Sequence, residues 1–409
     1  MKTFFASVEC VERGLDPFKT DLIVADSSRG KGSICLAITP KMKKRGIKNR
    51  CRVFEIPKDI HPIVAKPRMK KYIEYSVKVY SIYQKYISKE DIHVYSIDEA
   101  FLDVTNYLKL YKKNPYEIAK MILNDIYNTL GLTATCGIGT NMYLAKIALD
   151  ILSKHSPTNI GYLDEKLYKE KLWHHTPLTS FWQIGRGIEN RLHKLHIKDM
   201  YDIAHFNENR LYKEFGINAK LLIDHAWGIE PCTIKDIKNY KPKSNSISNN
   251  QILFKDYSFK DARVVLIEMI DNLVLNLVEK GLYTKCVGFS IGYSKDIISM
   301  QNIRVTLKKY TNSFNVIKNS LLMEYDYRIN SNYPIRRIGI WFSNLTNKKI
   351  EQLDLFGNAE KEVDDSKVEL AINKIKARFG KNSILRGISY TDIGTQRDRN
   401  KLIGGHNGE

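Results

Sequence analysis

The chain has 409 residues, which is longer than one compact core usually reaches and predicts three or more folding units. Its 65 Lys and Arg against 45 Asp and Glu give a formal net charge of +20, which favours a polyanion such as nucleic acid as partner over a basic protein without one. No apolar run reaches the roughly 18 residues of a membrane span. The start MKTFFASVECVE becomes charged too early for a signal peptide, so we expect a cytoplasmic protein without membrane contact.

Short β-prone runs alternate with helical periodicity over about the first 165 residues, which predicts an α/β domain. We expect an amphipathic first helix that carries Phe4, Val8 and Val11. A small basic insert follows at 21–60. Further helices are expected over 68–87, 116–130 and 140–153, and strands over 93–105 and 132–138.

The pattern changes after residue 165. From 166 to 230 short helices are separated by glycine turns. Residues 232–245, CTIKDIKNYKPKSN, are polar, basic and without periodicity, which predicts an exposed linker.

Beyond the linker the pattern predicts a β-α-β-β-α-β order with one sheet face buried under two helices and the other face free. Ser258 and Asp261 form a capping box for the first helix, and Gly281 ends it. The tail after 345 is polar with one amphipathic stretch near 367–379. The remaining expected elements are strands over 247–254, 287–293, 303–309 and 335–342 and a helix over about 313–325.

Six cysteines lie far apart in the sequence without a C-x-x-C pair. This spacing predicts reduced core residues, not a zinc site or a disulfide framework. The six are Cys10, Cys35, Cys51, Cys136, Cys232 and Cys286.

Residues 94–104, VYSIDEAFLDV, place Asp98 and Glu99 side by side in an apolar, β-prone run. In a continuous strand the two side chains would point to opposite faces, whereas a turn between VYSI and AFLDV brings both to a hairpin tip. Two Mg²⁺ ions held there could bridge a nucleotide triphosphate and activate a hydroxyl. The alternative is a pair of solvated turn residues.

The stretch VYSIDEAFLDVT resembles the second metal-binding motif of the Y-family, or translesion, DNA polymerases, and other motifs follow in that family's order. FFASVE resembles the first motif, and GIGTNMYLAKIALD (137–150) the third conserved block. IGRGIENRL (184–192) looks like the thumb hairpin and SISNNQ (246–251) like the entry to the little finger. ILRGISY and GTQRDRNKLIGGH look like the UmuC-like branch (ImpB/MucB/SamB type) of bacteria and their mobile elements.

The resemblance implies an α+β multidomain fold shaped like a right hand, with palm, fingers and thumb, plus a β-α-β-β-α-β little finger. The expected parts are a palm at 1–20 and 61–165, fingers at 21–60, a thumb at 166–231 with a helix-hairpin-helix, a linker at 232–245, a little finger at 246–345 and a tail at 346–409.

The resemblance also implies catalytic residues. Asp98 and Glu99 would bind two Mg²⁺ ions, with the main-chain carbonyl of Met1 as a further ligand. Phe5 falls at the steric gate, where an aromatic ring collides with a ribose 2′-hydroxyl; a core aromatic on the first helix is the alternative. Phe4 would then serve the core beside it.

Two lysines fall at triphosphate positions of the family. Lys43 lies within PKMKKRG of the fingers, where a cation offsets phosphate charge, whereas Lys41 and Lys44 are expected to be solvated. Lys154 is the second expected contact, although the family spacing fits Ser153 almost as well.

Two further sets of residues are implied to bind DNA. Gly185 and Gly187 would let a turn approach a duplex so that main-chain N–H groups bind phosphate, although glycine turns also simply join helices. On the free face of the little finger, Arg304, Thr306 and Lys308 would hold the duplex backbone.

The segment EQLDLFGN in the tail resembles the pentapeptide with which bacterial polymerases bind the sliding β clamp. The alternative is a tail segment folded back on its own domain. The five residues are Gln352, Leu353, Asp354, Leu355 and Phe356.

The first motif departs from the family pattern Asp-x-x-x-Phe-Phe. Counting back from Phe4 and Phe5 places the aspartate one residue before Met1, and the strand that leads to it is missing too. We expect that Met1 is an internal methionine of a longer protein; the alternative is a truncated, inactive relative.

The expected function is template-directed DNA synthesis past damaged bases, by two-metal nucleotidyl transfer from dNTP to a primer 3′-hydroxyl. The expected partners are primer-template DNA, dNTP and the β clamp, for a monomer. The alternative function is a catalytically inactive protein that binds DNA and the clamp. A helix-hairpin-helix nuclease or glycosylase is disfavoured because no separate catalytic set accompanies the hairpin.

Overall fold

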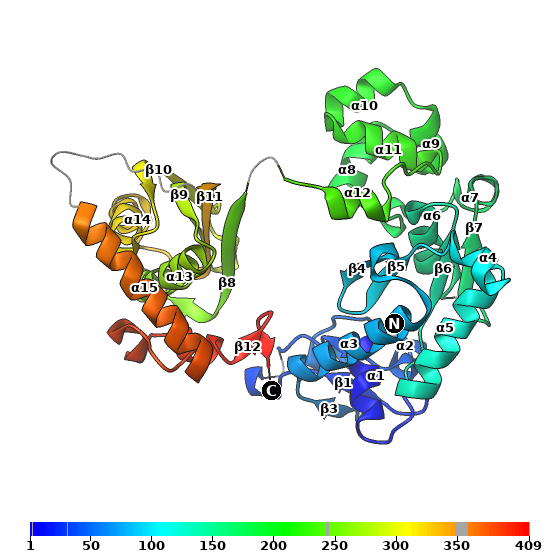
Figure 1. The fold of residues 1–409 in the computed structure, drawn as a ribbon, viewed down its shortest axis with the longest axis horizontal. Coiled ribbons are helices and arrows are strands. Elements are labelled where there is room, and N and C mark those ends of the chain that lie inside the picture. The colour runs from blue at the N-terminus through cyan, green and yellow to red at the C-terminus, as the bar shows by residue number, and fades with distance from the viewer. Residues whose placement is uncertain (2, 31, 155, 243–244, 348–358, 409) are drawn as a thin grey trace. The chain divides into compact units, whose positions relative to one another are not determined.

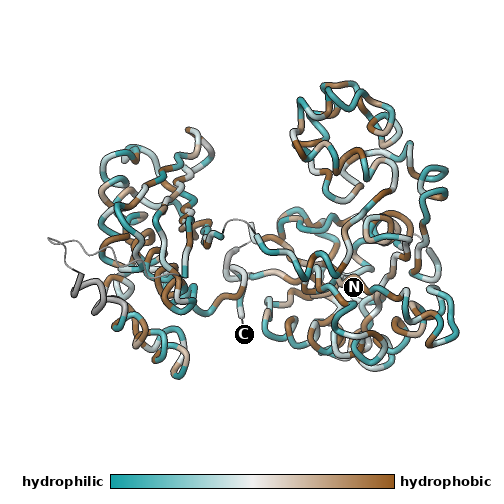
Figure 2. The backbone as a smooth tube through the Cα atoms, turned by 45° about the horizontal axis from the view of Figure 1, so that its top comes forward, coloured by the Kyte–Doolittle hydropathy of each residue, from teal (hydrophilic) through white to brown (hydrophobic). Residues whose placement is uncertain are grey.

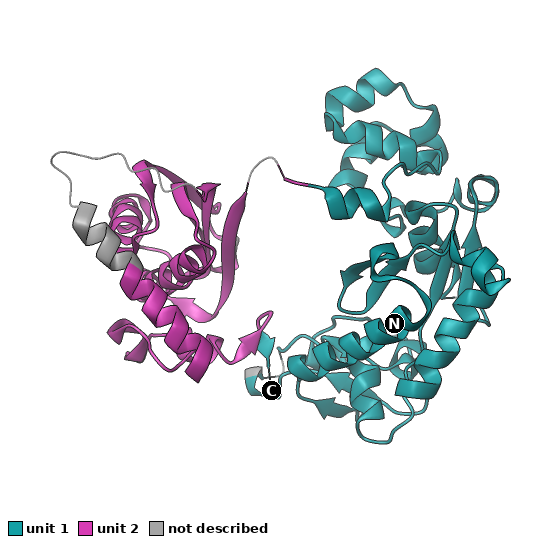
Figure 3. Cartoon of the chain, in the orientation of Figure 1, with its two compact units in different colours: residues 1–240, 406–409 teal, residues 241–405 magenta. Residues whose placement is uncertain are grey.

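The computed structural model describes the chain except residues 2, 31, 155, 243–244, 348–358 and 409. The chain divides into two compact units, residues 1–240 with 406–409 and residues 241–405 (Figure 3). Each unit has buried hydrophobic clusters of its own. Helices and strands are mixed in both (Figure 1), which confirms the expected α+β class.

The strands of the first unit form three small sheets in the part of the chain that the structure describes. One has the order β2-β1-β3, and the other two are the pairs β4-β5 and β6-β7. The strands are β1 (Leu22–Val24), β2 (Ala37–Ile38), β3 (Ile63–Ala65), β4 (Ile92–Ser96), β5 (Glu99–Leu102), β6 (Cys136–Gly139) and β7 (Ile160–Leu163).

The two long helices of the first unit lie where helical periodicity predicted them. Helix α3 buries one face made by Tyr72, Tyr75, Val79 and Ile82. Helix α5 begins at a capping box between Asn114 and Glu117. The helices are α1 (Phe4–Val11), α2 (Pro40–Lys44), α3 (Met69–Tyr86), α4 (Tyr107–Tyr111), α5 (Pro115–Leu130), α6 (Met142–Ile147), α7 (Glu165–Leu172), α8 (Arg186–Lys194), α9 (Met200–His205), α10 (Glu208–Phe215), α11 (Asn218–Ala226) and α12 (Ile234–Asn239).

The basic insert at 21–60 has a small hydrophobic cluster separate from those of its neighbours. Strands β1 and β2 and helix α2 each contribute one residue to it, and the segments between and after them contribute the rest, so the insert has a small core and is not a loop. Its buried members are Ile23, Ala25, Cys35, Ile38, Met42, Cys51 and Ile60.

Three expectations for this unit were wrong in detail. The helix expected over 140–153 is α at Met142–Ile147 and changes to a π turn at Ala148–Leu152. The strand expected from 132 begins only at Cys136. The expected linker contains helix α12, because Thr233 and Asp236 cap each other's main chain and Ile234 is buried.

The second unit contains the predicted β-α-β-β-α-β order. Its sheet has the strand order β10-β9-β11-β8 with antiparallel pairs throughout. Helix α13 packs on β8 and β11 and α14 on β9 and β10, so one face is covered. The elements are β8 (Ser246–Tyr257), α13 (Phe259–Glu279), β9 (Tyr283–Tyr293), β10 (Gln301–Thr311), α14 (Phe314–Arg328) and β11 (Ile335–Thr346).

At the start of α13 one of the two hydrogen bonds of the expected capping box is present, and at its end the expected glycine stop is confirmed. The Ser258 hydroxyl accepts a hydrogen bond from the Asp261 main-chain nitrogen (3.2 Å). Gly281 follows the helix with a φ of 62°, a left-handed conformation that glycine adopts without strain.

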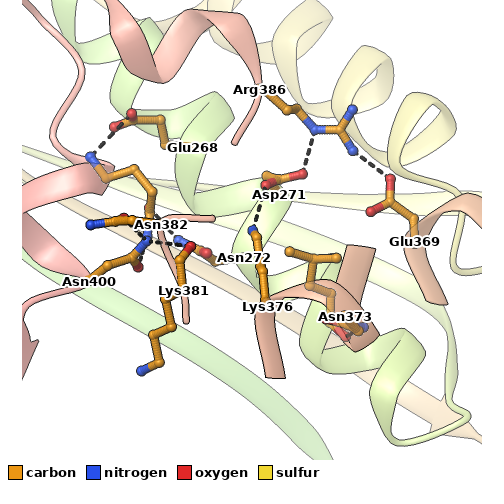
Figure 4. A network of polar contacts seen from close by, with 12 residues as sticks. Glu268, Asp271, Asn272, Glu369, Asn373, Lys376, Lys381, Asn382, Arg386 and Asn400 are labelled. Atoms are coloured by element: carbon orange, nitrogen blue, oxygen red, sulfur yellow. Dashed lines mark hydrogen bonds and ion pairs between the residues drawn. The ribbon is translucent and has the colours of Figure 1, made fainter. Parts of the chain in front are cut away.

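In the second unit, the described chain that follows β11 packs on α13 through its first helix, and Figure 4 shows the polar contacts there. Glu268 of α13 is buried and its carboxylate accepts hydrogen bonds from the main-chain nitrogen of Thr395 (2.9 Å), the Thr395 hydroxyl (2.9 Å) and the main-chain nitrogen of Gln396 (3.2 Å). This segment contains α15 (Ala359–Phe379), α16 (Gln396–Arg399), β12 (Leu402–Ile403) and β13 (His406–Asn407), and the sequence had indicated only α15.

Arg386 ties α15 and α13 together in the same network. Its guanidinium bonds to Asp271 on α13 and to Glu369 on α15, and it lies 3.5 Å from the ring centroid of Phe314. Because Asp271 and Glu369 are both buried, each would be costly without this partner.

No helix among the described residues is long and apolar enough to cross a membrane. Hydrophobic and hydrophilic residues alternate over short distances along the trace in Figure 2. The cysteines are free thiols, as expected, and Cys10, Cys35, Cys51 and Cys286 are buried. Cys232 is exposed at the surface, so the expectation of a core position was wrong for it.

The Glu268 contacts give a stability prediction. Glu268→Ala leaves three buried donors without an acceptor and should lower the local free energy of unfolding by about 3 kcal/mol, because hydrogen bonds to a charged group are the stronger kind. Native-state hydrogen exchange in peptides spanning 380–403 measures this. Glu279→Ala, at the exposed end of the same helix, is the control and should change exchange little. Equal protection in both variants would contradict the role of Glu268.

Candidate active site at a hairpin tip

The β4-β5 hairpin carries Asp98 and Glu99 at its tip. The register pairs Ile92 with Leu102 and Ser96 with Glu99, so the chain reverses at Ile97 and Asp98. The Ser96 hydroxyl donates a hydrogen bond to Oδ1 of Asp98 (3.0 Å). The turn expected between VYSI and AFLDV is therefore present, and both carboxylates lie at one end of the hairpin.

A buried lysine lies against this tip. The ammonium group of Lys146 is 2.7 Å from Oε2 of Glu99 and 3.3 Å from Oδ2 of Asp150. Burial alone would lower the pKa of Lys146, but the hydrogen bond to Glu99 and the charge of Asp150 outweigh it and raise the pKa. Lys146 therefore stays charged and offsets the repulsion between Asp98 and Glu99.

The glycines of β6 let helix α6 bring Lys146 to this position. A Cβ atom at Gly137 would lie 2.1 Å from the carbonyl oxygen of Ala145, and one at Gly139 would lie 2.2 Å from its nitrogen. No larger residue permits this contact without moving the helix. The CGIG strand thus sets the distance between the helix and the hairpin.

The π turn after α6 determines which residue faces outward. Its signature is a hydrogen bond from the Ser153 nitrogen to the Ala148 carbonyl (2.8 Å), which spans one residue more than in an α-helix. Ser153 is fully buried and its hydroxyl donates to Leu149 (2.7 Å). The ammonium group of Lys154 is 3.4 Å from Asp150, and its side chain is 58% exposed. Of the two candidates for phosphate binding, only Lys154 is accessible.

Lys43 and Lys154 come together from distant segments. Loss of solvation and the nearby charge of Lys154 lower the pKa of Lys43, which makes no ion pair with a described carboxylate. Lys41 of the same helix is instead paired with Asp21 (3.0 Å), so the expectation that it is simply solvated was wrong. The charge of Lys154 thus reaches Lys43, and two neighbouring cations suit a polyphosphate.

The two phenylalanines of the first helix have different surroundings. Phe4 is buried in the core, as expected. Phe5 is half-buried and stacks on Tyr72, with ring centroids 4.4 Å apart and planes 15° from parallel. The Tyr72 hydroxyl donates to Glu9 (2.8 Å), and Arg68 donates to the same carboxylate. Phe5 is therefore backed by a fixed aromatic ring.

A mostly apolar cavity of about 180 Å³ lies between β5 and β6, lined also by Met1, Asp98 and Glu99. Among the described residues β5 pairs only with β4 and β6 only with β7, so each of these two strands has one edge without a strand partner, and residues of both line the cavity. The main-chain nitrogen of Met1 donates a hydrogen bond to the carbonyl oxygen of Asp98 (2.9 Å). Met1 thus lies beside the carboxylate pair.

The donor set fits Mg²⁺ that is shared with substrate phosphates. Such sites hold the ion with one or two carboxylates, and water and phosphate oxygens complete the shell. Asp98 and Glu99 supply that number, and Asp98 accepts only one hydrogen bond from a described side chain. No described cluster joins three or more His, Cys, Asp or Glu side chains, so the described residues form no closed all-protein cage.

Sequence comparison places the chain in a family. The profile of the impB/mucB/samB family matches residues 1–150, and that of the impB/mucB/samB family C-terminal domain matches residues 244–355. A putative UV-damage repair protein UvrX of Bacillus subtilis (strain 168) is 33% identical, covering 99% of this chain and 96% of the relative. The chain belongs to the impB/mucB/samB branch of the Y-family DNA polymerases.

Two further comparisons agree with this Y-family assignment. DNA polymerase IV 2 of the same organism is 31% identical over 99% of this chain and 97% of its own length. A solved Y-family DNA polymerase chimera, Dbh-Dpo4(243-245)-Dbh, has a TM-score of 0.62 at 22% identity and covers 85% of this chain and 98% of its own. The latter similarity concerns the fold alone.

The expected DNA-contacting residues of this Y-family chain lie on exposed surfaces. Gly185 and Gly187 are at the start of α8, where a Cβ would meet no atom within 4 Å. The element before this turn is a single 3₁₀ turn, Leu178–Ser180, and not a full helix. Arg304, Thr306 and Lys308 are exposed on β10, opposite the buried Ile303 and Leu307. Residues 352–356, which were expected to bind the clamp, lie outside the described residues.

Sequence reasoning missed Lys146 and Asp150, which complete the charge arrangement at the hairpin tip. Both lie in the quoted block GIGTNMYLAKIALD, and their separation of four residues places them on one helix face. That spacing was a usable signal. The contact of Lys146 with Glu99 could not be predicted from spacing, because it joins segments 47 residues apart.

The close approach of α6 to Gly139 predicts a loss of stability when this glycine is replaced. Gly139→Ala should force α6 off β6 and destabilise the first unit by about 1–3 kcal/mol, the usual cost of overpacking. Gly187→Ala is the matched control, because its Cβ would enter open space and alanine favours a helix. Urea unfolding followed by circular dichroism compares the two. A smaller loss for Gly139→Ala than for Gly187→Ala would contradict the proposed packing.

Proposed function

We propose that this chain is a template-directed DNA polymerase that copies past damaged bases and transfers a nucleotidyl group from dNTP to a primer 3′-hydroxyl. The observation that carries the proposal is the pair Asp98 and Glu99 at one hairpin tip, with the accessible cations Lys43 and Lys154 in the same unit. The names of its relatives, which include a DNA polymerase IV 2 and a UV-damage repair protein, support the same reaction.

Mg²⁺, in two ions, is the proposed cofactor. Bound there it would lower the charge of the triphosphate and favour attack by the 3′-hydroxyl. Asp98 and Glu99 would hold it, with the main-chain carbonyl of Met1 as a further oxygen ligand. Lys43 and Lys154 would orient the triphosphate and offset its negative charge.

Phe5 is the proposed steric gate for the sugar. Its ring is held against Tyr72, so it cannot easily turn away from a ribose 2′-hydroxyl. Exclusion by a backed ring discriminates between sugars without requiring a hydrogen bond to the nucleotide. Phe4 belongs to the core beneath it.

The proposed DNA contacts are sequence-independent. The exposed turn at Gly185 and Gly187 offers main-chain N–H groups to a phosphate. Arg304, Thr306 and Lys308 form an exposed row on the open sheet face that suits a duplex backbone. We propose the corresponding division into palm, fingers, thumb, linker, little finger and tail, in a monomer that acts in the cytoplasm.

The carboxylate pair gives the first functional prediction. Asp98→Ala and Glu99→Ala should each reduce Mg²⁺-dependent primer extension by at least about a hundredfold, because loss of a metal ligand removes several kcal/mol of transition-state stabilisation. Primer-template affinity, measured by fluorescence anisotropy, should stay within about twofold, because neither residue is a proposed DNA contact.

Glu90→Ala, an exposed residue before β4, is the control and should extend primers like the unsubstituted chain. Equal extension by all variants would refute the assignment of the site. Tight DNA binding without any extension, both by the unsubstituted chain and by one with Asp added before Met1, would instead favour the alternative function, a DNA- and clamp-binding protein.

Clamp recruitment through Gln352, Leu353, Asp354, Leu355 and Phe356 is a further proposal, which rests on the sequence of this segment. Replacing Leu355 and Phe356 by Ala removes two apolar anchors, each worth about 1.5–3 kcal/mol when fully buried on docking. Retention on immobilised sliding β clamp should be lost, whereas extension in the absence of clamp should persist. Unchanged retention would show that this segment does not bind the clamp.

A further inference from the structure

Four side chains of alternating charge form a continuous row from the carboxylate pair to the exposed lysine. Glu99 contacts Lys146 (2.7 Å), Lys146 contacts Asp150 (3.3 Å), and Asp150 contacts Lys154 (3.4 Å). One end is a proposed metal ligand and the other a proposed triphosphate ligand. The two middle residues have no role in the reaction proposed above.

The members of this row differ in how freely they can move. The side chain of Lys146 is only 8% exposed, and α6 holds it against β6, so it is costly to leave without a negative partner. The side chains of Glu99, Asp150 and Lys154 are 29%, 28% and 58% exposed. The buried cation is therefore fixed, and its partners can exchange around it.

We propose that Lys146 and Asp150 are positioning residues that link metal binding at Glu99 to triphosphate binding at Lys154. When Glu99 turns to a divalent cation, Lys146 is held by Asp150 instead. Asp150 then releases Lys154, which becomes available to the triphosphate. This inference rests on the proposed function through the roles of Glu99 and Lys154.

The exchange makes the two binding events cooperative. Without Asp150, a metal would have to remove Glu99 from a buried lysine for which the described residues offer no other carboxylate partner. With Asp150, the same step leaves Lys146 paired and Lys154 free. Because linkage between sites is reciprocal, triphosphate bound at Lys154 must favour metal at Glu99 by the same factor.

Asp150→Asn should change two binding measurements in opposite directions. The affinity of the Asp150→Asn variant for Mn²⁺ should fall by at least about tenfold, because Glu99 is then the one described carboxylate left to pair with Lys146. Electron paramagnetic resonance on the full chain without DNA measures this affinity. The affinity of the variant for dNTP in EDTA should rise by about twofold, because Lys154 is no longer held in an exposed ion pair. A structural defect would weaken both.

Three further variants test the route of these effects. In a Lys146→Met background, Asp150→Asn should leave Mn²⁺ affinity unchanged, because no lysine then competes for Glu99. In a Lys154→Met background, Asp150→Asn should not raise the affinity for dNTP, because no lysine is released at position 154. The control is Asp224→Asn, which breaks a similar pair with Lys220 (3.0 Å, also four residues apart) in the thumb region and should alter neither measurement.

The outcomes separate this inference from the function on which it rests. Mn²⁺ binding that is lost in Asp98→Ala but unchanged in Asp150→Asn supports the metal site and overturns the exchange. Mn²⁺ binding that is the same in Asp98→Ala and in the unsubstituted chain overturns the metal site itself. A fall in both affinities for Asp150→Asn would show a structural role and also overturn the inference.

Discussion

Two carboxylates at the tip of one hairpin repel each other, and the buried ammonium group of Lys146 offsets that repulsion. The rest of the site depends on this contact. Gly137 and Gly139 present no side chain of β6 where the main chain of α6 approaches, so the helix lies close enough for Lys146 to reach Glu99. The π turn then continues the same helix and turns Lys154 outward. The glycines of β6 thus set the position of α6, and that position places the charge of Lys146 beside Glu99.

The elements of the site were predictable where local pattern decides them. The turn at Asp98, the helices α3 and α5 and the cap at Ser258 all follow from spacing within a few residues. The π turn at 148–152 does not, because an extra residue only shifts the phase of the hydrophobic pattern and too few helical residues follow it here to reveal the shift. The contact of Lys146 with Glu99 was hidden for another reason, since it depends on how two distant segments pack. Prediction therefore found the carboxylates and missed the lysine that keeps them together.

The second unit shows the same division between local and distant signals. Its strand and helix order followed from periodicity and capping, and the exposed row of Arg304, Thr306 and Lys308 followed from alternation along β10. The packing of the tail on α13 was not predicted, because the polar residues of the tail indicated a solvated segment. Their hydrogen bonds become visible only when Thr395 is placed beside a buried carboxylate. The described part of the tail packs on α13, and the row of Arg304, Thr306 and Lys308 is exposed on β10.

We propose above that Asp98 and Glu99 bind the catalytic metal while Lys146 stays paired with Asp150. A crystal of the chain with primer-template DNA, dNTP and Mn²⁺, measured at the manganese absorption edge, tests it directly. We expect an anomalous peak in coordinating contact with one carboxylate oxygen of Asp98 and one of Glu99, and we expect Lys146 to be paired with Asp150 in that crystal. A metal peak elsewhere, or one beside Asp98 with Glu99 still bound to Lys146, would contradict it.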